Sequence, residues 1–223
     1  MIKAILLDVD DTILDFHQSS RQSIIKAAEK AGLELPEVFF PVFTDINVSL
    51  WESYERGEIS RQHIFDTRWT RSFEQTGIEF DGVLFEKLFR QNLRQCAIRE
   101  PGAERMLRYL SERYPIYVAS NTVIDQQVNR MIIAGFHQYI TAYFTSDAIG
   151  YAKPSREFFV YCLKHLPAIK PEEMVMIGDS LTADIAGAAR CGIKTIWYDK
   201  YGKNIPDAAD WRITDLAEIE EIL

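Results

Sequence analysis

The chain has few cysteines, no long apolar run and fewer basic than acidic residues. Its three cysteines, Cys96, Cys162 and Cys191, are far apart and form no CxxC pair. This argues against a disulfide framework or a zinc site and favours reduced thiols in the cytoplasm. No apolar stretch approaches the roughly 20 residues that a transmembrane helix needs. The apolar start of the chain is too short for a signal peptide and leads directly into aspartates, so we expect a cytoplasmic protein.

The charge balance is acidic, with 25 Lys+Arg against 33 Asp+Glu and a net charge of −8 at pH 7. A nucleic-acid polymer or an anionic membrane would require a basic patch, so neither is an expected partner. The four histidines are scattered without metal-ligand spacing, and the sequence contains no repeat. With 47% apolar residues, the 223-residue chain has the composition of a globular protein and the length of one domain carrying an insertion. None of these features indicates an oligomeric state.

Short apolar runs alternate with segments of helical period over most of the chain. Uninterrupted apolar runs suit strands that are buried on both faces of a parallel sheet. Five such runs occur, at residues 2–7, 116–119, 139–144, 174–177 and 195–198. Helical spacing of apolar residues occurs over residues 103–113, 123–134 and 155–166, and in the second of these Val128, Met131 and Ile132 form the predicted buried face. The alternation predicts an α/β fold with a doubly wound, mainly parallel sheet.

Residues 15–97 break this alternation. They contain no convincing buried strand, but several helix-like segments and nine of the 13 phenylalanines, enough bulk for a core of their own. About 80 residues between consecutive strands is far more than one crossover connection requires. We therefore predict a helical domain at 15–97, inserted into a core domain of residues 1–14 and 98–223. The alternative is a set of ordinary crossover helices packed on the sheet.

The first candidate site follows the first apolar run and reads Asp8-Val9-Asp10-Asp11-Thr12. Ligands of open α/β sheets bind at the carboxyl ends of the strands. On an extended backbone, residues two apart point the same way, so Asp8 and Asp10 are expected to project together. Two carboxylates held so close require a cation or a shared proton. The alternative is that this cluster simply caps the next helix.

Two further candidates follow later strands. Ser120 and Asn121 end the second run, where small polar side chains and exposed backbone N–H groups can hold a phosphate at a helix N-terminus. A simple N-cap is an equal alternative for them. Lys153 precedes Pro154, which biases the lysine away from helical geometry. A lysine fixed there could meet a phosphate, whereas an ordinary loop lysine would be solvated.

The fourth candidate follows the run at 174–177 and contains Gly178, Asp179 and Asp184. Gly178 permits a tight turn from strand to helix. Asp179 is then expected at the carboxyl edge of the sheet, with Asp184 in the opening turns of the next helix. Hard oxygen ligands of this kind suit Mg²⁺, which binds through one or two carboxylates together with substrate phosphate. Capping by Asp179 would leave Asp184 unexplained.

Taken together, the four clusters resemble the four motifs of the haloacid dehalogenase superfamily, in the same order along essentially the whole chain. The matching residues are Asp8-x-Asp10-x-Thr12, Ser120, Lys153 and Gly178-Asp179-x4-Asp184. The resemblance implies a Rossmann-like core with a helical cap inserted after the first motif. It also implies an enzyme, a phosphatase that acts on a small-molecule phosphate monoester.

The same resemblance assigns a role to each matched residue. Asp8 would attack phosphorus and form an aspartyl-phosphate, while Asp10 would protonate the leaving group and then activate water. Phosphate binding would fall to Ser120, Asn121 and Lys153. Mg²⁺ would be held by Asp8, the backbone carbonyl of Asp10 and Asp179, with Thr12 and Asp184 supporting these ligands without binding the ion.

Within the superfamily, the insertion is similar to that of the house-cleaning pyrimidine 5′-nucleotidases. The similarity lies in Asn47-Val48-Ser49-Leu50-Trp51-Glu52-x-Tyr54-x2-Gly57-Glu58-Ile59, followed by Arg68-Trp69. It implies that a nucleoside 5′-monophosphate is the substrate. Trp51 and Tyr54 are candidates for stacking on a base, although they could equally be core residues. His17 is a further candidate because it follows the first motif closely.

Other functions remain open at this stage. A sugar-phosphate phosphatase or phosphomutase would use the same four motifs and differ only in the insertion. Dehalogenation is disfavoured because carbon–halogen cleavage needs no acid for a leaving oxygen, and Asp10 is present. A phosphonatase would need a lysine in the insertion, where only Lys26 and Lys30 lie early enough and Lys87 comes late. A binding module on an inactive scaffold is disfavoured because no motif residue is missing.

Overall fold

The computed structural model describes residues 1–166 and 168–223. These form two compact units, one of Met1–Phe16 with Ala97–Leu223 and the other of His17–Cys96. No helix in the described parts of the chain combines the length and the apolar character needed to cross a membrane. The two units are described separately below.

The first unit is built on a parallel six-stranded sheet with the order β3-β2-β1-β4-β5-β6. Its strands are β1 (Ala4–Leu7), β2 (Ile116–Ser120), β3 (Ala142–Thr145), β4 (Met174–Gly178), β5 (Lys194–Tyr198) and β6 (Trp211–Ile213). The predicted α/β class and parallel sheet are thus confirmed. The third strand begins later than predicted, because His137–Tyr139 form a 3₁₀ turn instead. The sixth strand is an addition to the five that were predicted.

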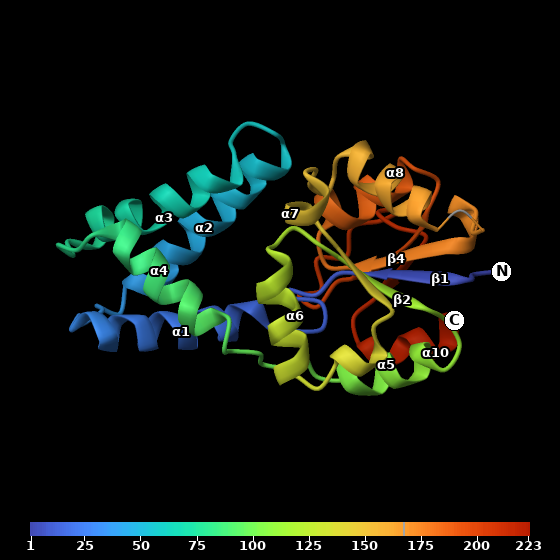
Figure 1. Ribbon diagram of the computed structural model, residues 1–223, viewed down its shortest axis with the longest axis horizontal. Coiled ribbons are helices and arrows are strands. Elements are labelled where there is room, and N and C mark those ends of the chain that lie inside the picture. Colours follow the sequence, from blue (N-terminus) through green and yellow to red (C-terminus); the bar gives the residue numbers. More distant parts are fainter. Residues whose placement is uncertain (167) are drawn as a thin grey trace. The chain divides into compact units, whose positions relative to one another are not determined.

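Helices cover both faces of this sheet (Figure 1). Alternate residues of each strand point to opposite faces, so Ile5 and Leu7 pack with one set of helices and Ala4 and Leu6 with the other. The first set comprises α5 (Ala103–Ser111), α6 (Ile124–Ile133) and α10 (Ile219–Ile222). The second comprises α8 (Arg156–His165) and α9 (Gly187–Ala189). Both faces of the central strands are therefore buried, as their uninterrupted apolar sequences require.

Helix α6 differs from the sequence prediction in the face that it buries. Met131 is buried as predicted, but Ile132 is 54% exposed. The other buried residues of α6 are polar, namely Gln127 and Arg130. A periodicity argument that counts only apolar residues could not choose this face, because the partner of Arg130 lies far away in the sequence.

The second unit consists mainly of four helices. They are α1 (Phe16–Ala31), α2 (Phe39–Glu55), α3 (Arg61–Thr76) and α4 (Gly82–Leu93). Trp69 is fully buried and stacks on Phe43 with a ring-centroid distance of 4.5 Å. Phe39, Phe73, Phe85 and Phe89 complete this aromatic core. The phenylalanine-rich segment thus has a core of its own, and Trp69 belongs to it.

A buried ion pair crosses the core of this helical unit. Arg68 donates from Nε to Glu86 Oε2 and from Nη2 to Oε1, each at 2.8 Å, and from Nη1 to Asn47 Oδ1 at 3.1 Å. The indole N–H of Trp69 donates to the same carboxylate. A bidentate pair with further hydrogen bonds is the arrangement in which a buried charge is tolerated. Arg68 is therefore a structural residue of the unit.

Candidate active site

The site lies where the chain order of the strands reverses. β1 has β2 on one side and β4 on the other, and the connections leave in opposite directions from this point. Such a switch point leaves a crevice outside the carboxyl ends of the strands. Asp8 follows β1 directly, and its backbone N–H donates to Ile177 O at 2.9 Å. The strand ladder therefore fixes the backbone from which the Asp8 side chain projects.

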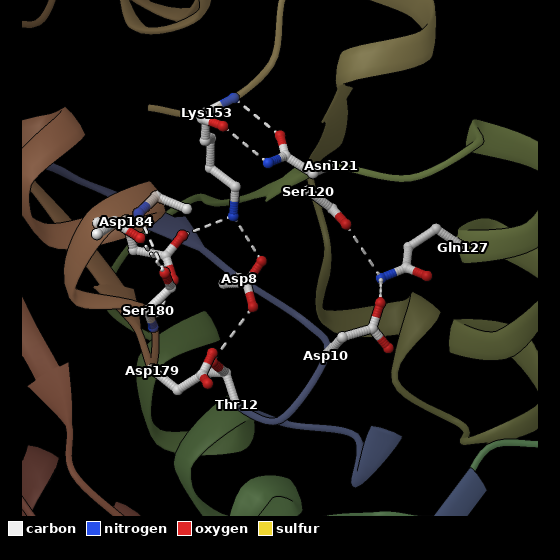
Figure 2. Close-up of polar contacts among 12 residues, drawn as sticks. Asp8, Asp10, Thr12, Ser120, Asn121, Gln127, Lys153, Asp179, Ser180 and Asp184 are labelled. Atoms are coloured by element: carbon white, nitrogen blue, oxygen red, sulfur yellow. Dashed lines mark hydrogen bonds and ion pairs between the residues drawn. The ribbon is translucent and has the colours of Figure 1, made fainter. Parts of the chain in front are cut away.

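Lys153 is held between two carboxylates. Its Nζ donates to Asp8 Oδ1 and to Asp184 Oδ1, both at 2.6 Å, and the residue is only 2% exposed (Figure 2). The side chain of Asn121 fixes the lysine backbone, because Nδ2 donates to Lys153 O and Oδ1 accepts from Lys153 N, each at 2.8 Å. Lys153 is thus a buried and doubly paired cation, unlike an ordinary loop lysine.

Asp184 reaches this lysine because of the glycine that ends β4. The helix after β4 begins as a π-helical turn, Leu181–Ala186, and Ser180 N donates to Asp184 Oδ2 at 3.1 Å. A Cβ added to Gly178 would lie 2.2 Å from Asp184 Oδ2. Position 178 must therefore be glycine for the carboxylate to fold back over the strand end.

Asp179 completes a compact acidic cluster with Asp8 and Asp184. One carboxylate oxygen from each of the three lies within 4.8 Å of the others. Thr12 bridges two members, since its Oγ1 donates toward Asp8 Oδ2 and Asp179 Oδ1, at 3.4 Å each. Trp197 fixes the backbone of Asp179, because its indole N–H donates to Asp179 O at 3.0 Å. This all-oxygen set suits a hard divalent cation such as Mg²⁺.

The charges of the cluster are only partly balanced by the protein. Burial raises the pKa of Asp8 to about 8; Lys153 acts against this rise, and Asp184 adds to it. Burial and then the neighbouring carboxylates of Asp8 and Asp184 raise the pKa of Asp179 well above its usual range. Although burial alone would lower it, the same two carboxylates raise the pKa of Lys153. One lysine for three acids leaves a site with a deficit of positive charge.

Asp10 lies near enough to Asp8 for its charge to add to the rise in the pKa of Asp8, and the expectation that the two side chains project together stays a prediction. Strand β1 ends at Leu7, and the chain then turns, with Asp11 at a φ of 59°. Asp10 itself precedes this turn and forms an isolated bridge with Leu14. Its carboxylate contacts helix α6, where Arg130 Nη1 lies 2.5 Å from Oδ1 and Gln127 Nε2 lies 3.3 Å from Oδ2.

The remaining predicted residues differ in their surroundings. Ser120 is buried at the end of β2, and its Oγ accepts from Gln127 Nε2 at 3.4 Å. In the helical unit, Trp51 and Tyr54 are partly exposed and form an edge-to-face pair with a centroid distance of 5.6 Å. His17 is exposed. The substrate-binding roles of these residues, and phosphate binding by Ser120 and Asn121, stay predictions.

A second cluster of acidic residues is already paired with a lysine of the protein. Ligand oxygens of Asp11, Asp15 and Glu100 lie within 4.8 Å of one another. Lys200 Nζ pairs with Asp11 Oδ1 at 3.3 Å and with Glu100 Oε1. The lysine supplies the charge that a metal would otherwise bring, so this group serves to fix the turn after Asp10.

Gln127 and Arg130 are site residues that the sequence reasoning missed. They are three residues apart on α6 and so share one face of the helix. The feature of the sequence that could have identified them is their position on the same helix face as the apolar residue Met131. That signal indicates a buried polar face but does not identify Asp10 as its partner.

The strand ends thus bring together three carboxylates and a buried lysine, and comparison with known proteins assigns the family. The model of a family described as haloacid dehalogenase-like hydrolase matches residues 2–192. The chain belongs to this family, which confirms both the sequence resemblance and the prediction that the protein is an enzyme.

Two curated relatives and one solved structure are similar over most of their lengths. YfnB of Bacillus subtilis (strain 168), described as a HAD-hydrolase, is 31% identical over 223 residues, covering 99% of this chain and 95% of YfnB. The crystal structure of YfnB bound to magnesium matches with a TM-score of 0.94, covering 100% of this chain and 98% of that one. The pyrimidine 5′-nucleotidase PynA of Streptococcus pneumoniae is 32% identical over 200 residues, covering 89% of this chain and 84% of PynA.

Proposed function

We propose that the protein is a Mg²⁺-dependent phosphomonoester hydrolase that acts through an aspartyl-phosphate on Asp8, with nucleoside 5′-monophosphates as substrates. The observation that carries the proposal is the juxtaposition of Asp8, Lys153 and Asp179 at adjacent strand ends. Phosphoryl transfer requires an in-line nucleophile and cations around the equatorial oxygens. The similarity to YfnB and to the nucleotidase PynA supports the class and the substrate, respectively.

In this mechanism Asp8 Oδ attacks phosphorus, and the bond from phosphorus to the ester oxygen breaks. The carboxyl group of Asp10 gives its proton to that oxygen as the alcohol departs. Asp10 then takes a proton from water as the water oxygen bonds to phosphorus, which releases phosphate and frees Asp8. Lys153 and Ser120 hold the phosphoryl oxygens, and Lys153 offsets the charge of the nucleophile.

The residues present fit a magnesium ion. Asp8 and Asp179 would bind it directly together with the backbone carbonyl of Asp10, while Asp184 and Thr12 would orient these ligands. When bound, Mg²⁺ would supply the positive charge that the three carboxylates lack and so permit a phosphate dianion to approach. The magnesium in the YfnB structure supports this assignment.

Mg²⁺ is expected to raise the melting temperature of the protein and to be required for phosphate release. The physical reason is that binding removes repulsion among three clustered carboxylates. Because burial raises the pKa of Asp8 to about 8, the ion must displace a proton at lower pH. The gain in Tm should therefore shrink from pH 8 to pH 6. Thermal unfolding with EDTA or Mg²⁺ at both pH values measures this, and a gain that is unaffected by Asp179→Asn would contradict the assigned ligand.

The substrate class is tested by a panel of nucleoside 5′-monophosphates, sugar phosphates and p-nitrophenyl phosphate with Mg²⁺. We expect the highest kcat/KM for a pyrimidine nucleotide. Equal values for sugar phosphates would favour a sugar-phosphate phosphatase, and isomerised sugar phosphate without net phosphate release would favour a mutase. No release from any member, despite Mg²⁺ binding, would overturn the proposal.

We further propose that the inserted domain, residues 15–97, acts as the cap that selects the substrate, through His17, Trp51 and Tyr54. Trp51→Ala is then expected to raise KM for uridine 5′-monophosphate by about 10-fold, since stacking on a base contributes roughly 1–3 kcal/mol. Ribose 5-phosphate, which has the same leaving sugar but no base, is the matched control and should be unaffected. An equal rise in KM for both substrates would show that the indole recognises no base.

A further inference from the structure

Helix α6 buries a polar face against the site. Gln127 and Arg130 are both 0% exposed, although a guanidinium is costly to bury without a partner. Both lie on the side of α6 that contains Met131, a member of the core cluster. A buried guanidinium of this kind requires a neighbouring group of opposite charge.

That group is the carboxylate of Asp10. Arg130 Nη1 donates to Oδ1 at 2.5 Å and Gln127 Nε2 donates to Oδ2 at 3.3 Å, so both carboxylate oxygens are held. Arg130 Nη1 also donates to Gln127 Oε1 at 3.3 Å, which fixes the two donors relative to each other. The Asp10 side chain is 28% exposed while Arg130 is 0% exposed. The Asp10 carboxylate is therefore hydrogen-bonded by buried donors of α6 while part of its surface remains exposed to solvent.

The same amide ties Asp10 to the end of β2. Gln127 Nε2 lies 3.4 Å from Ser120 Oγ and 3.3 Å from Asp10 Oδ2 (Figure 2). Strand β1 does not supply this fixation, because it ends at Leu7 and the bridge of Asp10 with Leu14 involves the backbone alone. The position of the Asp10 carboxylate relative to Ser120 thus depends on α6.

We propose that Gln127 and Arg130 are positioning residues for Asp10, which hold its carboxyl group in the orientation that meets the leaving oxygen. This rests on the proposed phosphatase function. We assign both residues a role through Asp10 and not through contact with the substrate. Each carboxylate oxygen has two lone-pair sites, so one remains for the proton that Asp10 gives to the ester oxygen and later takes from water.

The test compares two leaving groups. p-Nitrophenolate departs with little need of a proton, whereas the alkoxide of an alkyl monoester must be protonated. We expect Arg130→Gln and Gln127→Met to lower kcat/KM about 100-fold for the alkyl monoester that the wild type hydrolyses fastest, and no more than about 10-fold for p-nitrophenyl phosphate. Arg130→Lys, which keeps the charge, should recover part of the loss. Equal losses on both substrates would overturn the proposal.

A double-mutant cycle separates positioning from a structural role. In an Asp10→Asn background, Arg130→Gln and Gln127→Met should have no further effect on kcat/KM, because the group that they position is gone. Additive losses there would overturn the inference. Gln127→Met keeps volume and changes no charge, so it decides the question even if Arg130→Gln does not fold. A wild-type enzyme that releases phosphate from neither substrate would refute the proposed function, whereas equal losses in an active enzyme refute only the positioning.

Discussion

Asp8→Asn is expected to lower phosphate release from every monoester by at least about 10⁴-fold, because an amide oxygen cannot form the covalent intermediate. Asp8 alone follows β1 directly, with its backbone held by Ile177 and its Oδ1 2.6 Å from Lys153 Nζ. Asp10 is not expected to replace it, because its carboxylate is held by α6. The measurement is steady-state phosphate release with Mg²⁺, together with trapping of radiolabelled phosphoenzyme by acid quench in the wild type.

The same substitution should leave the fold intact, which separates a catalytic role from a structural one. Asn has nearly the volume of Asp, and burial has already raised the pKa of Asp8 to about 8, so loss of the charge costs the folded state little. We expect a melting temperature in EDTA no lower than that of the wild type. Asp66→Asn, at an exposed position on α3, is the matched control and should retain full activity. Full turnover by Asp8→Asn would remove the aspartyl-phosphate mechanism.

The sequence predicts the sheet well because its central strands are buried on both faces. An uninterrupted apolar run such as residues 174–177 indicates a segment that is buried in the core. The observed strand Met174–Gly178 extends this run by one residue. The strand Trp211–Ile213 escaped prediction because it has three residues, of which Trp211 and Arg212 are exposed. An edge strand buries too little apolar surface to leave a clear pattern in the sequence.

The site was less predictable than the sheet because its geometry depends on distant partners. The sequence places Asp8 and Asp179 at strand ends, and strand order then brings them together. It does not indicate that Asp10 pairs with Arg130, because the two are 120 residues apart in the sequence. Local pattern thus located the candidate residues, whereas only the fold could assign their partners.

Lys153→Met is expected to have the largest effect on stability, lowering the free energy of unfolding in EDTA by about 3–5 kcal/mol and abolishing phosphate release. Met nearly matches the volume of Lys but leaves Asp8 and Asp184 without the cation that lies 2.6 Å from each. The carboxylates must then remain close together without compensation. Because burial already raises the pKa of Asp8 and of Asp179, the deficit should grow as the pH rises and these groups lose their protons.

Two variants make this expectation specific to the buried pair. Lys194→Met removes a lysine whose side chain is 44% exposed and pairs with Asp210 at the surface, so it should cost no more than about 1 kcal/mol. Adding Asp184→Asn to Lys153→Met removes one of the repelling charges and should restore part of the stability, but not the activity, because the cation that meets the phosphate is still missing. Chemical denaturation at pH 6 and pH 8 measures all three proteins. A Lys153→Met protein as stable as the wild type at pH 8 in EDTA would mean that the three carboxylates do not share a site of negative charge, and the case for a metal ion between Asp8 and Asp179 would fail with it.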